Sequence, residues 1–175
     1  MKSIKTLGTV LLISSAALYS CGAGEDKKVS TTETPTSMIE TPASMIETTD
    51  STVVVNMTGD DKMKFNISEI MAKAGQKITI HLKNIGNLPK ETMSHNFILL
   101  KQGTDVAAYA LKAMSAKDSE YFPEAEKDKT IAHTKMLGPG ESDSISFDAP
   151  APGKYEYICS FPGHFSIMRG TLIIQ

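Results

Sequence analysis

The 175-residue sequence has no tryptophan, few other aromatic residues and only two cysteines, at positions 21 and 159. So few cysteines exclude a disulfide-rich scaffold, because small secreted domains of that class use four or more. The chain also lacks an excess of basic residues, since 18 Lys and Arg stand against 20 Asp and Glu. Residues 51–175 carry 14 charges of each sign, and nothing in this composition indicates nucleic-acid binding, which needs a basic surface.

The amino-terminal hydrophobic run is too short to cross a membrane. Leu7–Leu18 follows Lys2 and Lys5, a pattern typical of a secretory signal rather than of a spanning helix. The run ends in Leu-Tyr-Ser-Cys-Gly, which resembles the bacterial lipobox, in which the cysteine becomes the lipid-modified amino terminus. We predict that residues 1–21 are a lipoprotein signal peptide ending at lipidated Cys21; the alternative is an ordinary signal peptide with an incidental cysteine.

Residues 22–50 are rich in Thr, Ser and Glu and carry a net charge of −4. They contain an imperfect seven-residue duplication, Thr34–Glu40 followed by Thr41–Glu47. Two copies, each with a proline, are too few for a coiled coil. We predict a flexible acidic tether with a root-mean-square reach of about 30 Å, which holds a periplasm-facing domain on a membrane of the bacterial cell envelope. The alternative is that the repeated Met-Ile pairs anchor a partner.

From Ser51 onward, short β-rich runs alternate with turn residues. The expected strands are Thr52–Met57, Met63–Phe65, Lys77–Lys83, Asn96–Leu100, Thr130–Lys135, Ser142–Phe147, Lys154–Cys159 and Gly170–Ile174. One helix is predicted over Asp105–Met114, because a capping signal opens it at Thr104-Asp105, and Lys117–Lys129 is expected to be a loop. Many short strands with one short helical insertion predict an all-β domain over residues 51–175, a Greek-key β-sandwich.

The segment Tyr155–Arg169 gathers three metal-binding side chains in one loop. Cys159, His164 and Met168 offer a thiolate, an imidazole and a thioether. These donors suit one copper ion that shuttles between Cu(I) and Cu(II), provided that a second His completes the set. If Cys21 is acylated, Cys159 has no disulfide partner, and metal ligation explains why a lone cysteine persists in an oxidising compartment.

The second His must come from elsewhere in the chain. His81 occupies the polar phase of an alternating strand, and His133 lies among small and charged residues, so both are expected at the surface. His95 precedes an apolar strand in Thr92-Met-Ser-His-Asn-Phe97, where a turn can aim it at a neighbouring loop. His95 is therefore the favoured candidate for the missing ligand.

These motifs, in this order, resemble the azurins, small electron carriers of the blue-copper cupredoxin family, over essentially all of residues 53–175. The matching segments are Met63–Asn66, Gly86–Lys90, Met93–Asn96, Ile131–Lys135, Gly140–Ser144, Cys159–His164 and Met168–Leu172. Each segment alone is a weak signal, but a Cys-x4-His-x3-Met loop completed by an upstream His-Asn is a strong one. The resemblance implies a cupredoxin-like sandwich with a type 1 copper site.

The resemblance also assigns roles to individual residues. It implies that His95, Cys159 and His164 are the equatorial copper ligands and that Met168 is a long axial ligand. The backbone carbonyl of Ser94 would be a weak contact on the opposite side. Most members have Gly at that position, and a backbone donor allows Ser to replace it.

Two further features around the metal follow from the resemblance. Backbone N–H groups of Asn96 and Phe161 would bond the Cys159 sulfur and tune the reduction potential. Electrons would cross the His164 ring edge, which emerges through an apolar docking patch. That patch comprises Met63, Leu88, Met93, Phe161, Pro162 and Gly163. A neutral domain with such a patch favours transient hydrophobic docking over charge steering; the alternative for Met63 and Leu88 is that they fill the core.

Four departures from the family pattern are visible. Val53 and Gln76 replace the cysteines of the usual disulfide, a loss of about 2–5 kcal/mol unless something compensates. Phe97 replaces a buried Trp, and Phe165 is larger than the usual residue after the ligand His. Asn84 replaces a His whose protonation shifts the redox potential in some members, so we expect no such pH switch here.

Together these features predict a non-enzymatic, monomeric one-electron carrier. Its partners would be the membrane, through the lipid, and redox proteins such as cytochromes or a terminal reductase or peroxidase. The alternative is a copper storage or delivery protein, although the chain has no Met cluster typical of exchangeable sites. A copper oxidase or nitrite reductase needs further His ligands, typically His-x-His pairs, and the four His of this chain form none. A metal-free adhesive sandwich is the remaining alternative.

Overall fold

The computed structural model describes residues 44–175. The predicted signal peptide, the predicted lipidation site Cys21 and the predicted tether up to residue 43 lie outside the described residues. No helix among the described residues is long and apolar enough to span a bilayer. The strands are β1 (Ile46–Thr48), β2 (Thr52–Gly59), β3 (Glu69–Ala72), β4 (Lys77–Asn84), β5 (Ile98–Leu100), β6 (Thr130–His133), β7 (Ser142–Asp148), β8 (Gly153–Ile158) and β9 (Arg169–Ile174). The α-helix α1 is Val106–Met114, and two short 3-10 helices span Lys117–Ser119 and Glu124–Lys129.

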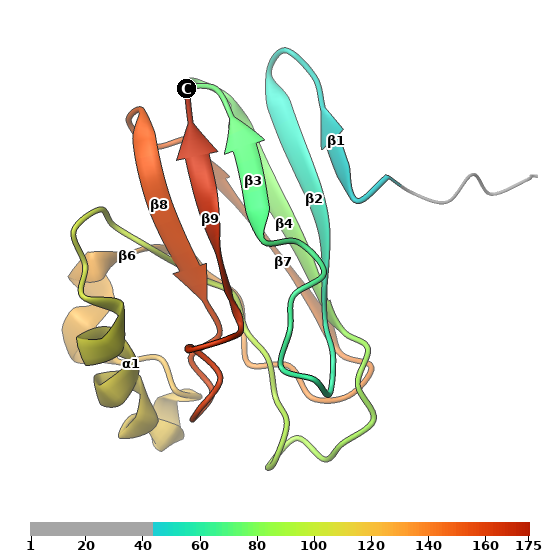
Figure 1. Ribbon diagram of the computed structural model, residues 1–175, viewed down its shortest axis with the longest axis vertical. Coiled ribbons are helices and arrows are strands. Elements are labelled where there is room, and N and C mark those ends of the chain that lie inside the picture. The colour runs from blue at the N-terminus through green and yellow to red at the C-terminus, as the bar shows by residue number, and fades with distance from the viewer. Residues whose placement is uncertain (1–43) are drawn as a thin grey trace, which may run out of the picture. The chain divides into compact units, whose positions relative to one another are not determined.

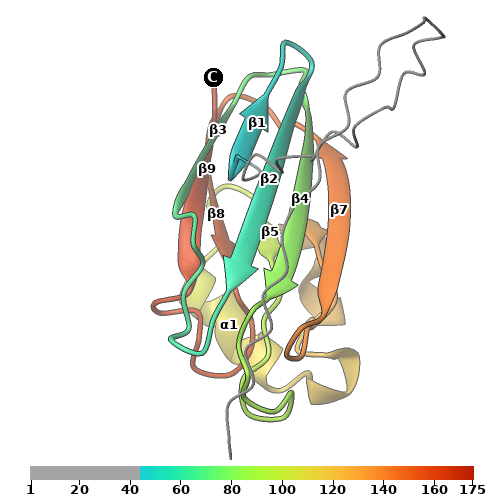
Figure 2. The same cartoon turned by 90° about the vertical axis from the view of Figure 1, so that its right-hand side faces the viewer.

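Two sheets face each other in residues 44–175 (Figures 1 and 2). One has the order β1-β2-β4-β7 and the other β3-β9-β8-β5-β6. The pairs β2–β4 and β3–β9 are parallel, and the other pairs are antiparallel. The chain crosses from one sheet to the other after β2, β3, β4, β6 and β7, and α1 is inserted between β5 and β6. The predicted Greek-key β-sandwich with one short helical insertion is confirmed.

The core lies between the sheets because strands β2 and β4 alternate buried and outward-facing residues. Val55 on β2 and Ile80 on β4 pair in register and are at most 1% exposed. Each such buried aliphatic side chain contributes about 1.5–3 kcal/mol. Phe97, the residue that replaces the usual Trp, is fully buried and stacks on Tyr157 with ring centroids 5.1 Å apart.

Helix α1 covers the outer face of the second sheet. Asp105 caps its amino terminus by accepting a hydrogen bond from the Ala108 N–H at 3.0 Å, as the capping signal predicts. The buried face of the helix packs against β5 and β8. The cluster that results comprises Ile98, Leu100, Val106, Tyr109 and Ile158, with Phe122 and Phe165 at its edge. Phe165 therefore connects the metal-binding loop to the helical layer.

The structure corrects four local predictions. Strand β1 lies within the range predicted as tether, because a strand of three residues is too short to show a periodic signal. Strand β3 is absent from the predicted strands, since its four residues become a strand only through pairing with β9. Met63–Phe65 is not a strand: Met63 has a left-handed backbone (φ 55°), and Phe65 forms a single bridge with Gly59. The predicted loop Lys117–Lys129 contains the two 3-10 helices.

A hydrogen-bonded glutamine lies where the family disulfide is expected. Gln76 is 3% exposed. Its Nε2 donates to the Thr49 carbonyl at 2.7 Å, and its Oε1 accepts from the Lys73 N–H at 2.6 Å. Gln76 thereby connects the β1–β2 turn to the β3–β4 turn, while Val53 is fully buried in the core.

Candidate metal centre

The loop that carries three of the predicted ligands lies at the end of the sandwich opposite the carboxyl terminus (Figure 1). Cys159 directly follows β8, and Met168 directly precedes β9. Because β8 and β9 pair with each other, the loop turns back between neighbouring strands. The Cys159 N–H donates to the Met168 carbonyl at 2.9 Å, and the Met168 N–H donates to the His164 carbonyl at 2.8 Å. The ligand loop is therefore closed on itself by its own backbone.

His95 is held by a different part of the chain. It forms an antiparallel bridge with Leu137, in which each backbone N–H donates to the other carbonyl, at 3.0 and 2.8 Å. Asn84, 1% exposed, donates from Nδ2 to the same Leu137 carbonyl at 3.0 Å and accepts from the Gly86 N–H at 2.8 Å. These bonds fix the backbone of His95 before any metal binds.

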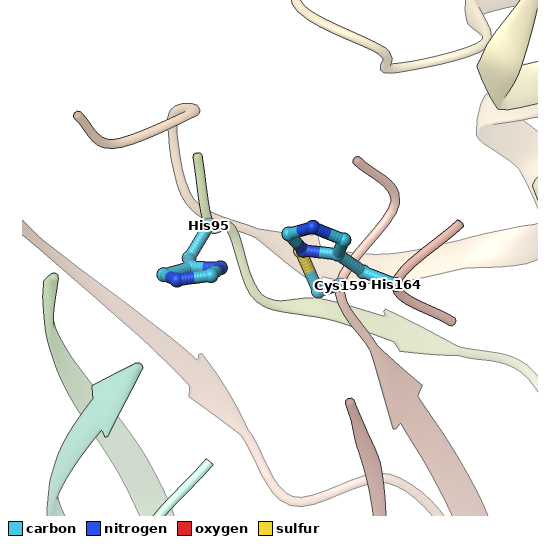
Figure 3. A group of neighbouring side chains, drawn as sticks. All are labelled: His95, Cys159 and His164. Carbon is cyan, nitrogen blue, oxygen red and sulfur yellow. The ribbon is translucent and has the colours of Figure 1, made fainter. Parts of the chain in front are cut away.

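The structure brings His95, Cys159 and His164 together, and their side chains point toward one another (Figure 3). Their ligand atoms all lie within 4.8 Å of one another. Cys159 Sγ is 3.6 Å from His164 Nδ1, and the two imidazole centroids are 5.2 Å apart. All three side chains are buried, with His164 the most exposed at 2%. Two imidazoles and a thiol therefore converge on one point that is almost completely closed to bulk water.

The two imidazoles are in the form that binds a metal. Neither ring nitrogen of His95 makes a hydrogen bond within the described part of the chain, which is costly for a buried polar group unless it has another partner. Burial lowers the pKa of His95, partly opposed by the backbone and carboxylate of Asp60 and by Asp61. Burial also lowers the pKa of His164 to about 4, and His95 acts in the same direction. Both rings are therefore neutral at pH 7.

The Cys159 thiol needs a neighbouring cation in order to ionise. Burial raises its pKa to about 12, while the backbone N–H groups of Asn96 and Phe161 near the sulfur act in the opposite direction. A coordinated metal ion supplies the positive charge that deprotonates such a thiol. A thiolate with two neutral imidazoles and a nearby thioether is the donor set of a blue-copper site. The orphaned nitrogens of His95 and the buried thiol thus fit copper.

The two weaker contacts predicted for the metal lie beside this group. Met168 is fully buried and packs with Cys159. The Ser94 carbonyl oxygen is 3.8 Å from Cys159 Sγ, and the Ser94 hydroxyl donates to the Lys90 carbonyl. Coordination by Met168 and by the Ser94 carbonyl remains a prediction.

Gly59, at the end of β2, is missing from the predicted site residues. A Cβ at this position would lie 2.7 Å from the terminal methyl of Met168 and 2.8 Å from Cδ2 of His95. Glycine therefore lets the strand approach both side chains. A glycine that ends a strand, followed by Asp60-Asp61, reads as an ordinary turn in the sequence, so only the tertiary contact reveals its role.

A hydrogen-bond network that also escaped prediction joins the two ligand segments. Asn96 Nδ2 donates to Ser160 Oγ at 2.9 Å, and the Ser160 N–H donates to Asn96 Oδ1 at 2.8 Å. Ser160 Oγ donates in turn to the Tyr121 carbonyl at 2.8 Å. The Tyr121 ring meets Phe161 edge-on, with centroids 5.3 Å apart. His95 and Cys159 are thus tied together through their next residues in the chain.

The remaining predicted positions lie at or near the surface. His81 and His133 are exposed, and His133 stacks on Phe122 with centroids 4.0 Å apart. In the predicted docking patch, Leu88 is 44% exposed and Gly163 is exposed, while the others except Phe161 are half-buried. Phe161 differs from that expectation: it is 8% exposed, because its ring packs with Met136, Cys159 and Met168.

Comparisons with known proteins agree with this geometry. Residues 51–175 match the family of copper binding proteins described as the plastocyanin/azurin family. Azurin-2 of Alcaligenes xylosoxydans xylosoxydans is 42% identical over 117 residues, which are 65% of this chain and 90% of the relative. Azurin of Pseudomonas fluorescens biotype C is 40% identical over 126 residues, or 69% and 97% of the two chains. Auracyanin A, a "blue" copper protein of Chloroflexus aurantiacus, superimposes with a TM-score of 0.65 at 33% identity, covering 71% of this chain and 100% of that one. The chain belongs to the plastocyanin/azurin family of blue-copper electron carriers, with copper as its cofactor.

Proposed function

We propose that this protein carries single electrons between redox proteins while tethered to a bacterial envelope membrane. Copper, when bound, supplies the one-electron couple between Cu(I) and Cu(II). The observation that carries the proposal is the closure of the site: the three ligands are buried and held by backbone bonds on two separate segments. A site held in this way changes little between oxidation states, which favours fast electron transfer. It also exchanges metal slowly, which disfavours copper storage or delivery.

The predicted docking patch, which the family resemblance puts around His164, is suited to brief docking. Two loops carry it, and Asp61 ties them together by accepting from the Asn87 N–H at 2.9 Å and from the Leu88 N–H at 3.3 Å. The adjacent Asp60 carboxylate accepts from the Lys62 N–H at 3.0 Å, within the turn that presents Met63. A preformed apolar surface loses little entropy on docking. We propose that cytochromes or a terminal reductase or peroxidase dock here, with His164 as the point of electron transfer.

The electron-carrier proposal is tested on the copper-loaded protein. Addition of Cu(II) should produce an intense blue thiolate-to-copper band that bleaches reversibly on reduction and is absent in Cys159→Ala. Stopped-flow mixing with a reduced cytochrome should oxidise the cytochrome faster than copper leaves the protein to a chelator. Copper release that outpaces electron transfer would favour storage or delivery instead.

The membrane anchor is tested separately. We propose that Cys21 is acylated and that the lipid holds the domain at the periplasmic side of the envelope. Labelled fatty acid should be incorporated into the wild-type protein and not into Cys21→Ala. Equal labelling of the two, or no labelling of either, would remove the anchor from the proposal and leave the copper site untouched.

A further inference from the structure

The seven-residue duplication has no part in the metal centre, but its second copy has a visible role in the fold. Residues 46–48 form strand β1 and pair antiparallel with residues 53–55 of β2. The Asn56 N–H donates to the Met45 carbonyl at 2.8 Å, and Asn56 Nδ2 donates to the Ser44 carbonyl at 3.0 Å. Ile46 packs against the main core. The block Ser44–Thr48 is therefore a peptide docked along the edge of β2.

The docked block occurs twice in the chain. Ser44-Met-Ile-Glu-Thr48 is identical, residue for residue, to Ser37-Met-Ile-Glu-Thr41. The contacts of the docked copy use its backbone and the Ile side chain, and both are present in the first copy. Residues 37–41 lie outside the described part of the chain and are identified by sequence alone. Five identical residues mean that the edge of β2 cannot distinguish the copies by their own side chains.

We propose that the edge of β2 is a binding site for the sequence Ser-Met-Ile-Glu-Thr, and that residues 37–41 of the same chain exchange there with residues 44–48. In the exchanged register Ile39 replaces Ile46 and Glu40 lies opposite Val54. The connection to β2 lengthens from residues 49–51 to residues 42–51, and the entropy of loop closure grows only with the logarithm of length. A block seven residues away is present at a high effective concentration, so the same chain outcompetes a second molecule.

The turn that follows the block makes the second copy the major occupant. The Thr49 N–H donates to the Thr52 carbonyl at 2.9 Å, and Thr49 Oγ1 accepts from the Thr52 N–H at 3.0 Å. The Thr49 carbonyl also accepts from Gln76. The residue that follows the first copy is Pro42, which has neither an N–H nor a hydroxyl. The first copy can therefore make the strand contacts but not the two turn bonds that use the Thr49 N–H and hydroxyl.

Exchange would change the length of chain that precedes the folded domain. Docking of the first copy moves the start of the ordered domain seven residues toward the amino terminus, which removes up to about 25 Å of extended chain. With the lipid anchor proposed above, the domain would then sit closer to its membrane. The exchange itself depends on neither the metal nor the lipid, so it can be tested independently of the proposed function.

Engineered disulfides test the register in the full chain with Cys21→Ser. Glu47→Cys with Val54→Cys reports the observed register, Glu40→Cys with Val54→Cys reports the exchanged one, and Ala43→Cys with Val54→Cys is the control. Residue 43 is nearer to 54 in sequence than residue 40, yet it lies outside the repeated block. Cys159 is fully buried and does not compete. With Ile46→Asp added to disfavour the second copy, the 40–54 bond should form about tenfold faster than the 43–54 bond.

Adding Ile39→Asp should abolish that advantage. Equal rates for the two bonds, no effect of Ile39→Asp, or a 40–54 bond found only between two chains would each overturn the proposal. A stability measurement without engineered cysteines gives a second readout. Ile39→Asp alone should leave the unfolding equilibrium unchanged, but in the Ile46→Asp background it should shift that equilibrium by about fivefold. If Ile46→Asp unfolds the domain outright, the first copy does not substitute and the proposal is wrong.

Discussion

Removal of the Gln76 side chain should reveal what replaces the missing disulfide. The family disulfide would close a loop of about 24 residues and contribute about 3.4 kcal/mol by the chain-entropy relation. Gln76 makes two short hydrogen bonds from a position that is 3% exposed. At about 1 kcal/mol for each bond, Gln76→Ala should lower the free energy of unfolding by about 2 kcal/mol. The glutamine would thus offset more than half of the lost constraint.

Urea and thermal unfolding of the metal-free domain measure this change. For a domain of this size, about 2 kcal/mol corresponds to a fall in Tm of about 6–10 °C. Gln102→Ala is a matched control, because Gln102 is an exposed glutamine with one long bond of 3.4 Å to the Lys154 carbonyl. If Gln76→Ala and Gln102→Ala cost the same, the interpretation of Gln76 as a substitute for the disulfide is refuted.

Four further predictions concern the ligands and the helical layer. Gly59→Ala should alter the thiolate-to-copper band and weaken copper binding, because the added methyl lies within 3 Å of Met168 and His95. Thr58→Ala is the control and should leave the band unchanged. If Gly59→Ala also leaves the band unchanged, this prediction is wrong. In the metal-free protein, burial holds the Cys159 pKa at about 12, so iodoacetamide at pH 8 should label the native thiol about a thousandfold more slowly than the unfolded one; comparable rates would disprove the burial argument. Glu126 is buried between Lys112 and Lys129, which lower its pKa. The ionised carboxylate therefore stabilises the fold above the unfolded pKa of about 4.3, and this stabilisation is lost as pH falls through the lowered folded pKa. Glu126→Gln should therefore destabilise the domain at pH 7 and cost progressively less as the pH is lowered below about 4.3, as a series of urea titrations would show. The reduction potential should show no His-like step between pH 5 and 8 arising at position 84, since Asn84 is an amide bonded to Leu137; a step removed by Asn84→Gln would contradict this.

The sandwich and the three donors of the Cys159–Met168 loop could be predicted from the sequence because their signals are local. Lys77–Lys83 alternates strictly, and β4 follows it to within one residue. The Cys159, His164 and Met168 donors lie within ten residues, so a single turn brings them close together. His95 is only the favoured candidate from its position before an apolar strand, and the resemblance turns that preference into an assignment, because a lone His before a strand has no distinctive pattern.

The elements that escaped prediction are defined by tertiary contacts. Strand β1 exists because β2 has a free edge, and Gly59 matters because two ligand side chains lie against it. Tyr121 adopts a left-handed backbone (φ 60°), which is sterically disfavoured for a bulky residue, and its carbonyl accepts a hydrogen bond from Ser160 Oγ. Strand β1 pairs with a near neighbour, but its three residues are too few to show a period. The other two features depend on residues far away in sequence, and neither periodicity nor composition records such distances.

Phe165 limits how freely the ligand loop can be moved between proteins. Its ring joins the cluster beneath α1, while its neighbour His164 faces Phe161 and His95. A loop transplanted from this chain into another cupredoxin would leave a large aromatic ring without its pocket. Conversely, a relative's loop placed here would leave a gap of one aromatic ring under the helix. Engineering of the copper potential in this scaffold must therefore treat the loop and helix α1 as one unit.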